Sequence, residues 1–258
     1  ATQAGLRLVL SIRNSGGRGQ PSSPPTDLEA YQRTVGDILD RYRPAVVVVE
    51  NEENSKLFYA GSPQAYHQQL QAACEAAHAR RLACTNGGLV STLVALLVAD
   101  DYARQGQADR ADRYRQRTLD PERYRLYQRR PSAPRITDQV AKGQALLAGY
   151  RSAGADYVNF HWYITDTEAL AEAVAFLTRV TGLPALTNEV GQQENEDPQQ
   201  VTAVMTRILE LKLPIAVWFS VDVPGYGHAR ALMNDDGTLR ENGRAFKMFI
   251  ETRFPSRQ

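Results

Sequence analysis

The chain has 258 residues, of which 43% are hydrophobic and 23% are charged, so residues 1–258 can form a single globular domain with a sizeable core. A formal net charge of +1 argues against nucleic acid or an anionic membrane surface as a partner, and no apolar run is long enough to span a bilayer. The two cysteines, Cys74 and Cys84, form no disulfide framework and have no zinc-ligand spacing, so we expect two buried thiols.

Short runs rich in β-branched residues alternate with amphipathic stretches along the whole chain. In chain order we expect a strand at 6–12, helix 26–42, strand 45–50, helix 62–81, strand 81–85, a helical region from residue 91, strand 157–164, helix 167–182, strand 184–190, helix 197–212, strand 215–221 and helix 241–253. Residues 101–135 are dense in Arg, Tyr and Gln and are expected to be helical pieces of an insertion. The strands lack clean alternation, which is typical of a parallel sheet covered by helices.

The expected fold is therefore α/β, of the (β/α)8 TIM-barrel type, but only six βα units can be counted. Residues 1–5 resemble the last turn of a helix with Gly5 as its C-cap. We therefore expect the chain to begin at the end of the second helix of such a barrel and to hold strands three to eight. An open, doubly wound six-stranded sheet is the structural alternative.

Polar residues follow several of the expected strands, where a βα barrel carries its reacting groups. They include Arg13, Asn14, Glu50–Asn54, Thr85, Asn86, His161–Tyr163, Asn188, Glu189, Trp218 and Asp222. Carboxylates beside an apolar core are costly unless they are paired or functional. Cleavage of a glycosidic bond requires two carboxyl groups, one that protonates the leaving oxygen and one on the opposite side of the bond. Glu52 and Glu189 can supply such a pair.

Two of these runs resemble motifs of clan A glycoside hydrolases, which are retaining TIM-barrel enzymes. The run from Glu50 to Asn54 resembles the strand-four motif, often W-N-E-P-N, which implies Glu52 as acid/base and Asn51 as the ligand of the sugar 2-hydroxyl. The run from Thr187 to Gly191 resembles the strand-seven motif, which implies Glu189 as the nucleophile. The chain departs from the pattern at Glu50, where Trp is usual, at Glu53, where Pro is usual, and at Asn188.

Two further runs resemble the same clan. The run from Phe160 to Tyr163 resembles strand six, which implies that His161 and Tyr163 contact the nucleophile. Trp218 matches the strand-eight Trp beneath the sugar, although packing in the core is the competing interpretation. Asn86, at the end of its strand, is a further candidate for substrate binding. Arg13 either binds substrate or only neutralises the neighbouring carboxylates.

The resemblance implies a retaining glycoside hydrolase that cleaves a β-linked oligo- or polysaccharide with no metal or organic cofactor. Its partner would be a carbohydrate, and its location secreted or periplasmic. A catalytically impaired carbohydrate-binding protein is the main alternative, and unpaired sheet edges would then favour self-association. A divalent-metal hydrolase using Glu50, Glu52 and Glu53 is a third possibility, disfavoured because successive residues at a strand end point in alternate directions.

Overall fold

Six parallel strands form the centre of the molecule in the computed structural model, which describes residues 6–14, 20–192, 196–221 and 231–255. One sheet has the order β1 (Val9–Ile12), β2 (Val46–Val49) and β3 (Ala83–Asn86), and a second has the order β4 (Val158–Trp162), β5 (Ala185–Val190) and β6 (Ala216–Trp218). Parallel bridges from Thr85 to Tyr157 and from Leu89 to Phe160 join β3 to β4. The strands thus follow one another in space in the order of the sequence.

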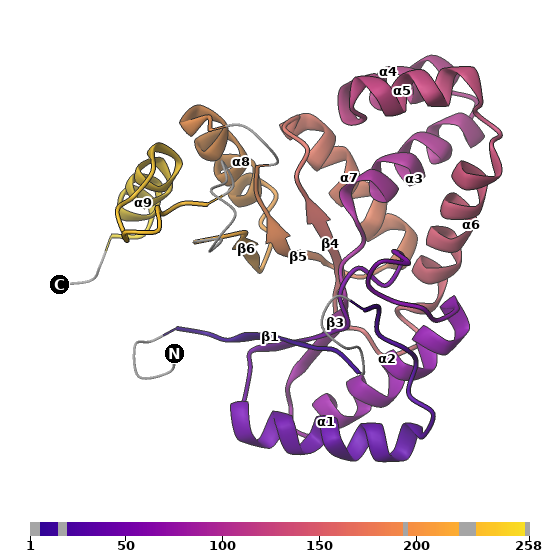
Figure 1. Ribbon diagram of the computed structural model, residues 1–258, viewed down its shortest axis with the longest axis vertical. Helices are drawn as coiled ribbons and strands as arrows, with labels where there is room; N and C mark the ends of the chain where they lie inside the picture. The colour runs from indigo at the N-terminus through magenta and orange to yellow at the C-terminus, as the bar shows by residue number, and fades with distance from the viewer. Residues whose placement is uncertain (1–5, 15–19, 193–195, 222–230, 256–258) are drawn as a thin grey trace.

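This unbroken order excludes the doubly wound alternative, because a doubly wound sheet reverses its strand order at a switch point. The helices that cover the strands are α1 (Leu28–Tyr42), α2 (Pro63–His78), α3 (Ser91–Arg104), α6 (Pro134–Gly149), α7 (Thr167–Thr181), α8 (Pro198–Glu210) and α9 (Glu241–Arg253). They lie on the outside of the curved array of strands (Figure 1). The fold is that of repeated βα units of the TIM-barrel type.

A closed eight-stranded barrel is not formed by the described residues. The two sheets make an arc, and β1 and β6 lie at its free edges with a gap between them in Figure 1. The expected helix end at Gly5 lies outside the described residues, as does Asp222. Val217 on β6 is 39% exposed, and association through these edges stays a prediction.

Helix starts follow local side-chain capping. Asp27, Ser62, Asp166 and Asp197 each accept a hydrogen bond from a backbone N–H in the first turn of the helix that follows. These bonds satisfy amides that have no partner inside the helix. The expected boundaries of these helices are therefore confirmed to within a few residues. At the end of α7, Gly182 adopts φ 66°, a left-handed conformation that suits glycine.

The two cysteines correct one expectation. Both are buried as expected, but Cys74 of α2 and Cys84 of β3 form a disulfide with their Cα atoms 5.3 Å apart. Helix α2 packs directly on β3, which brings two residues ten apart in the sequence into bonding range. Two isolated cysteines at this spacing carry no sequence signal for that packing.

Residues 101–135 contain two short helices, α4 (Ala108–Thr118) and α5 (Pro121–Arg129), as the sequence predicts. Helix α4 packs on α3 and α7, outside the layer of helices that covers the strands (Figure 1). Tyr114 of α4 is buried and donates a hydrogen bond to the carbonyl of Ala169. None of the described helices is long and apolar enough to cross a membrane.

Candidate active site

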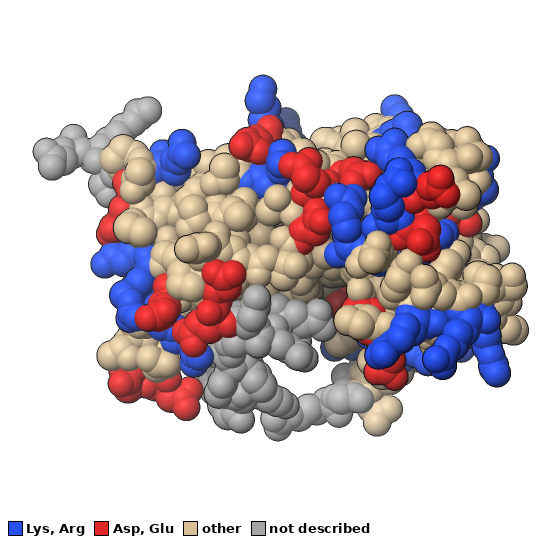
Figure 2. Space-filling view, turned by 90° about the horizontal axis from the view of Figure 1, so that it is seen from above, with Lys and Arg blue, Asp and Glu red and all other residues tan. Residues whose placement is uncertain are grey.

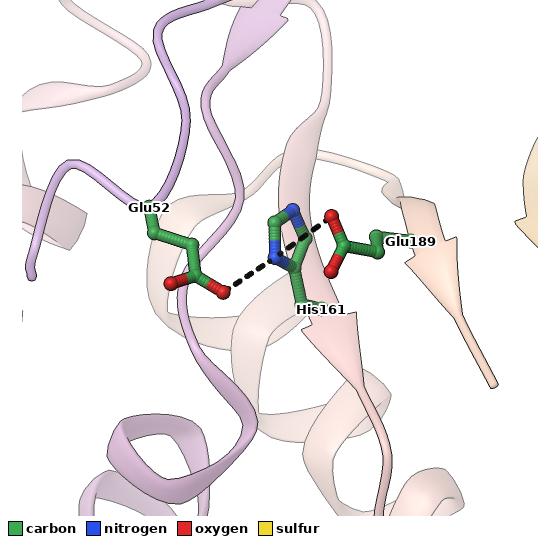
Figure 3. Close-up of side chains that lie close together, drawn as sticks. All are labelled: Glu52, His161 and Glu189. Atoms are coloured by element: carbon green, nitrogen blue, oxygen red, sulfur yellow. Dashed lines mark hydrogen bonds and ion pairs between the residues drawn. The ribbon is translucent and has the colours of Figure 1, made fainter. Parts of the chain in front are cut away.

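Glu52, His161 and Glu189 come together at the carboxyl ends of three strands (Figure 3). Glu52 follows β2, His161 lies in β4 and Glu189 lies in β5. His161 and Glu189 are register partners in the β4–β5 pair. Parallel strands end at one edge of the sheet, which is why residues 109 positions apart in the chain meet here.

The imidazole of His161 lies between the two carboxylates. Its Nδ1 is 3.0 Å from Glu52 Oε1 and 3.6 Å from Glu189 Oε2. One oxygen of Glu52 and one of Glu189 lie within 4.8 Å of each other. The His161 side chain is fully buried, whereas those of Glu52 and Glu189 are 16% and 21% exposed. A ligand can therefore reach both carboxylates but not the histidine that joins them.

The surroundings of His161 favour its protonated form. Burial by itself would lower its pKa, but the hydrogen bond to Glu52 and the charges of Glu189, Glu52 and Glu53 outweigh burial, and the pKa is raised. The second ring nitrogen, Nε2, lies 3.2 Å from Asn188 Oδ1, an oxygen that also accepts a hydrogen bond from Asn159. Both ring nitrogens thus face acceptors, which matches an imidazolium.

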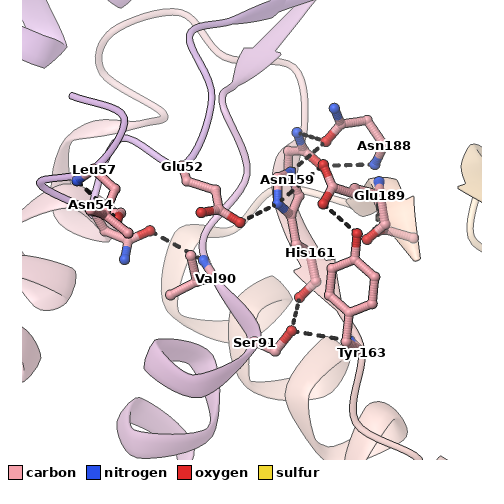
Figure 4. A network of polar contacts seen from close by, with 12 residues as sticks. Glu52, Asn54, Leu57, Val90, Ser91, Asn159, His161, Tyr163, Asn188 and Glu189 are labelled. Carbon is pink, nitrogen blue, oxygen red and sulfur yellow. Dashed lines mark hydrogen bonds and ion pairs between the residues drawn. The ribbon is translucent and has the colours of Figure 1, made fainter. Parts of the chain in front are cut away.

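Tyr163 and Ser91 support this group from below (Figure 4). The Tyr163 hydroxyl donates to Glu189 Oε1. Ser91 Oγ donates to the carbonyl of His161 at 3.1 Å and accepts the backbone N–H of Tyr163 at 3.1 Å. The sequence indicated Tyr163 but not Ser91, which begins α3 and has no motif of its own.

A ladder of three asparagines runs behind the site. Asn159 exchanges hydrogen bonds with Asn86 on one side and Asn188 on the other. Asn86 also donates to Glu53 Oε1 at 2.9 Å. Asn86 and Asn159 are fully buried, so the structure places Asn86 behind the site. Sequence reasoning missed Asn159, whose position inside a strand gives no local signal.

The three neighbouring glutamates have separate surroundings. Glu50 is buried and accepts hydrogen bonds from Gln69 and from the backbone of Asn14, with Arg13 Nε 3.9 Å from its other oxygen. Glu53 is also fully buried; burial raises its pKa, against hydrogen bonds from Tyr150 and Asn86. Only Glu52 faces His161. Glu50, Glu52 and Glu53, the metal set disfavoured from the sequence, do not form one group in the described residues, because their carboxylates point into different surroundings.

The backbone gives Glu52 this separate direction. Glu50 has φ 73° and Glu52 has φ 45°, both in the left-handed region that non-glycine residues seldom adopt. The N–H of Glu52 donates to the carbonyl of Gly87, and its carbonyl accepts the N–H of Ser55. Such local strain is tolerated where surrounding bonds hold it, and it is enriched at functional sites.

The other residues predicted from the sequence lie in different places. Asn51 adjoins Glu52 and makes no side-chain hydrogen bond within the described part of the chain. Arg13 donates to Ser22 Oγ and to the Phe58 carbonyl, and it faces Glu50, so the neutralising role fits its position.

Trp218 packs its ring against Phe246 of α9, in the layer between β6 and the helices. This arrangement corresponds to the core-packing interpretation of Trp218. Its neighbour Phe219 packs edge-on against Tyr163 with ring centroids 6.3 Å apart. Phe219, which follows β6 directly and is 37% exposed, is therefore the aromatic side chain from this segment that lies at the site.

Within the described ranges, Glu52, His161 and Glu189 are the one group of acidic, histidine or cysteine side chains arranged so that they could hold a metal ion. A divalent cation would need the Nδ1 lone pair of His161. A metal would therefore compete with the proton that the raised pKa of His161 favours on the ring. The arrangement fits proton and hydrogen-bond chemistry better than metal binding.

The comparison with solved structures finds chains of similar fold. No family model and no curated protein matches the sequence. Among solved structures, a GH128 subgroup II endo-beta-1,3-glucanase from Sorangium cellulosum is similar, with a TM-score of 0.54 and 18% sequence identity. The alignment covers 95% of this chain and 81% of the glucanase chain. For an endo-beta-1,4-glucanase from Xanthomonas axonopodis pv. citri, the alignment covers 96% of this chain and 75% of the glucanase chain, with a TM-score of 0.54 and 10% sequence identity.

A GH128 subgroup VII oligosaccharide-binding protein from Trichoderma gamsii also aligns, with 96% of this chain and 88% of its own, at TM-score 0.50 and 13% identity. Proteins described as hydrolases and as binding proteins thus share this architecture. The chain therefore has the α/β fold of repeated parallel βα units seen in the TIM-barrel glycoside hydrolases of group GH128.

Proposed function

We propose that this protein is a retaining glycoside hydrolase that cleaves a β-linked glucan, with Glu52 as acid/base and Glu189 as nucleophile. The observation that carries the proposal is the pair of partly exposed carboxylates from β2 and β5, with oxygens within 4.8 Å of each other. Retaining enzymes hold their two carboxyl groups about 5–5.5 Å apart, and inverting enzymes leave about 6.5–9.5 Å for a water molecule. The short separation supports retention.

In the first step Glu52 gives a proton to the leaving oxygen while a carboxylate oxygen of Glu189 bonds to the anomeric carbon. The glycosidic bond breaks, and the sugar is held as a glycosyl ester of Glu189. In the second step Glu52 takes a proton from water, the water oxygen bonds to the anomeric carbon and the ester bond to Glu189 breaks. Two inversions at the same carbon give overall retention.

His161 and Tyr163 act through the two carboxylates. The imidazolium offsets the repulsion between Glu52 and Glu189, and its Nδ1–H lies within hydrogen-bond distance of Glu52 Oε1. Proton transfer across that 3.0 Å contact would make Glu52 the neutral acid that the first step requires. The Tyr163 hydroxyl orients Glu189 Oε1. Both are positioning residues, while Asn51 and Phe219 are the adjoining side chains proposed to contact the sugar.

The substrate class is proposed from the similar structures. Several of them are described as beta-1,3-glucanases, and one was solved with laminarihexaose. A β-1,3-linked glucan is therefore the first substrate to test. The disulfide between Cys74 and Cys84 supports a secreted or periplasmic location, since such bonds persist in oxidising compartments.

The test uses the variants Glu189→Ala and Glu52→Ala with a β-1,3-glucan oligosaccharide, and Glu210→Ala of α8 as a matched control away from the site. Each site variant is expected to lose more than about 1,000-fold in kcat/KM, since each removes a group that forms or breaks a bond. Azide is expected to restore turnover of an activated aryl glycoside, with an α-glycosyl azide from Glu189→Ala and a β-glycosyl azide from Glu52→Ala. Substantial hydrolysis by Glu189→Ala would contradict the assignment.

The second candidate is a protein that binds the same sugars without cleaving them. The free edges of β1 and β6 favour it, because the described residues leave the wall of the barrel open beside the site. In that case the wild-type chain binds a β-1,3-glucan oligosaccharide in calorimetry, while no product accumulates from it or from an aryl glycoside. Hydrolysis abolished by Glu189→Ala would exclude this candidate.

A further inference from the structure

A large cleft has Glu52 in its wall. Its volume is about 1500 Å³. The loop after β2, the start of α3 and helices α5 and α6 line it. Glu52 is part of the lining, whereas His161 and Glu189 are not. Under the proposed function, on which this inference rests, Glu52 protonates the leaving oxygen, so the cleft lies on the leaving-group side of the scissile bond.

Cations exceed anions in the lining of this cleft. The basic residues are Lys56, Arg123, Arg125, Arg129, Arg135 and Lys142. The acidic residues are Glu52, Asp120, Glu122 and Asp138. Asp120 is already paired with Arg123 at 3.2 Å. Figure 2 shows basic side chains gathered on the side of the molecule where α5 and α6 lie in Figure 1.

Lys142 of α6 differs from the surface cations because it is only partly exposed. It forms no ion pair or hydrogen bond with the described residues. Burial lowers the pKa of Lys142, with Glu53 and Lys56 acting on it in opposite directions. A partly buried cation that has no direct ion pair interacts more strongly with a bound anion than an exposed cation does.

Arg125 adds a second unsatisfied cation to the same cleft. It is exposed on α5, and among the described residues its guanidinium donates only to the carbonyl of Pro121. Four of its five donor groups are therefore available to a ligand, in a planar fork that fits a carboxylate or a sulfate. Arg125 and Lys142 come from two helices that face one cleft.

We propose that this cleft binds a negatively charged part of the sugar chain, a carboxylate or a sulfate ester, on the leaving-group side of the bond that is cleaved. The preferred substrate is then an acidic glucan or glycan. The cleft is large enough for several sugar rings, since ligand sites commonly measure about 300–1,000 Å³. Lys142 binds the anionic group of the sugar at the wall of the cleft, and the arginines of α5 and α6 extend the positive electrostatic potential along the cleft.

The test compares β-1,3-glucan oligosaccharides that differ only at the reducing end, which lies on the leaving-group side. One form ends in an aldonate carboxylate, one in a sulfated alditol and one in the neutral alditol, over a series of chain lengths. Binding is measured by calorimetry with the Glu189→Gln variant, so that no cleavage occurs. At least one anionic form is expected to bind about tenfold more tightly than the neutral form, the usual gain from one hydrogen bond to a charged group. The form that binds more tightly identifies the anion.

Placed in the same background, Lys142→Met is expected to remove most of this preference. It keeps an unbranched apolar stem on α6 and removes the charge. The matched control is Lys247→Met, because Lys247 is exposed on α9 and lies outside the cleft. Arg125→Gln, at an exposed position, provides a second variant that leaves the packing intact. It is expected to reduce the preference in part, and added salt is expected to reduce it in every protein that retains it.

Equal binding of the anionic and neutral forms at every chain length would overturn the proposal, as would a preference that both Lys142→Met and Arg125→Gln leave intact. The proposed function is tested separately by cleavage of the neutral oligosaccharide by the wild-type chain. Cleavage without charge preference refutes the proposed anion binding by the cleft alone. Charge-dependent binding without any cleavage refutes the hydrolase alone and leaves the cleft as a binding site for acidic sugars.

Discussion

Gly88 offers a way to move His161 without changing any titratable group. Its backbone has φ 96°, and a Cβ added there would lie 2.5 Å from His161 Cδ2 and closer still to Nε2. Ordinary contacts between carbon atoms are about 3.5 Å, so the buried imidazole would have to shift by about 1 Å in Gly88→Ala. That shift is large enough to break the 3.0 Å contact between His161 Nδ1 and Glu52 Oε1.

Gly106 is the matched control. It also has a left-handed backbone, with φ 76°, but an added Cβ would meet nothing within 4 Å. The left-handed conformation costs about 1–2 kcal/mol for a residue with a Cβ, and this cost applies to both substitutions. Overpacking adds about 1–3 kcal/mol for Gly88→Ala alone. We therefore expect losses in the free energy of unfolding of about 1–2 kcal/mol for Gly106→Ala and about 2–5 kcal/mol for Gly88→Ala.

The two variants should differ more in activity than in stability. A displacement of about 1 Å in a supporting group can cost about 100-fold in rate. We expect a loss of that order in kcat for Gly88→Ala and none for Gly106→Ala. Stability is measured by urea denaturation, and activity by hydrolysis of a β-1,3-glucan oligosaccharide at a temperature where both variants are folded. Equal stability and equal activity of the two would refute the assigned contact between Gly88 and His161.

Three further predictions concern the disulfide, His161 and Phe219, the residue that follows β6. Replacing Cys74 and Cys84 by Ala should lower the free energy of unfolding by about 3 kcal/mol, because the disulfide closes a loop between residues ten apart. In urea denaturation, a reductant should lower the stability of the wild type but not that of the variant. Despite burial, the bond to Glu52 and the nearby negative charges raise the pKa of His161 above 6.5, so its stabilising effect should be complete below pH 6.5 and disappear as pH rises through the raised value. The difference in unfolding free energy between wild type and His161→Gln, measured against pH, should therefore shrink with rising pH; a constant difference would contradict the imidazolium. Phe219→Ala should raise KM for the oligosaccharide about tenfold or more with little change in the fold, because a partly exposed aromatic ring acts mainly in binding the ligand. An unchanged KM would leave Trp218 as the better candidate for the aromatic residue that contacts the sugar.

The spacing of the strand-end motifs along the chain predicts the order of the strands but not the distances between their side chains. The sequence indicates Glu52, His161, Tyr163 and Glu189 because each lies where a β-rich run ends, and parallel strands bring such ends to one edge. The positions of the helices follow from periodicity and from capping residues such as Asp27 and Asp197, which act within one turn of the chain. These features are local, so a single sequence is enough to predict them.

Other features depend on which elements pack together. Cys74 and Cys84 bond because α2 lies on β3, and Trp218 contacts Phe246 because α9 packs beside α8 next to β6. Lys142 lines a cleft with Glu52 only because α6 packs beside the loop after β2. Each of these contacts joins residues whose positions are set by helix and sheet packing and not by neighbours in the chain. The sequence by itself therefore determined the order of βα units and the candidate carboxylates, and the tertiary structure decided which side chains surround them, because side-chain packing is a long-range property of the fold.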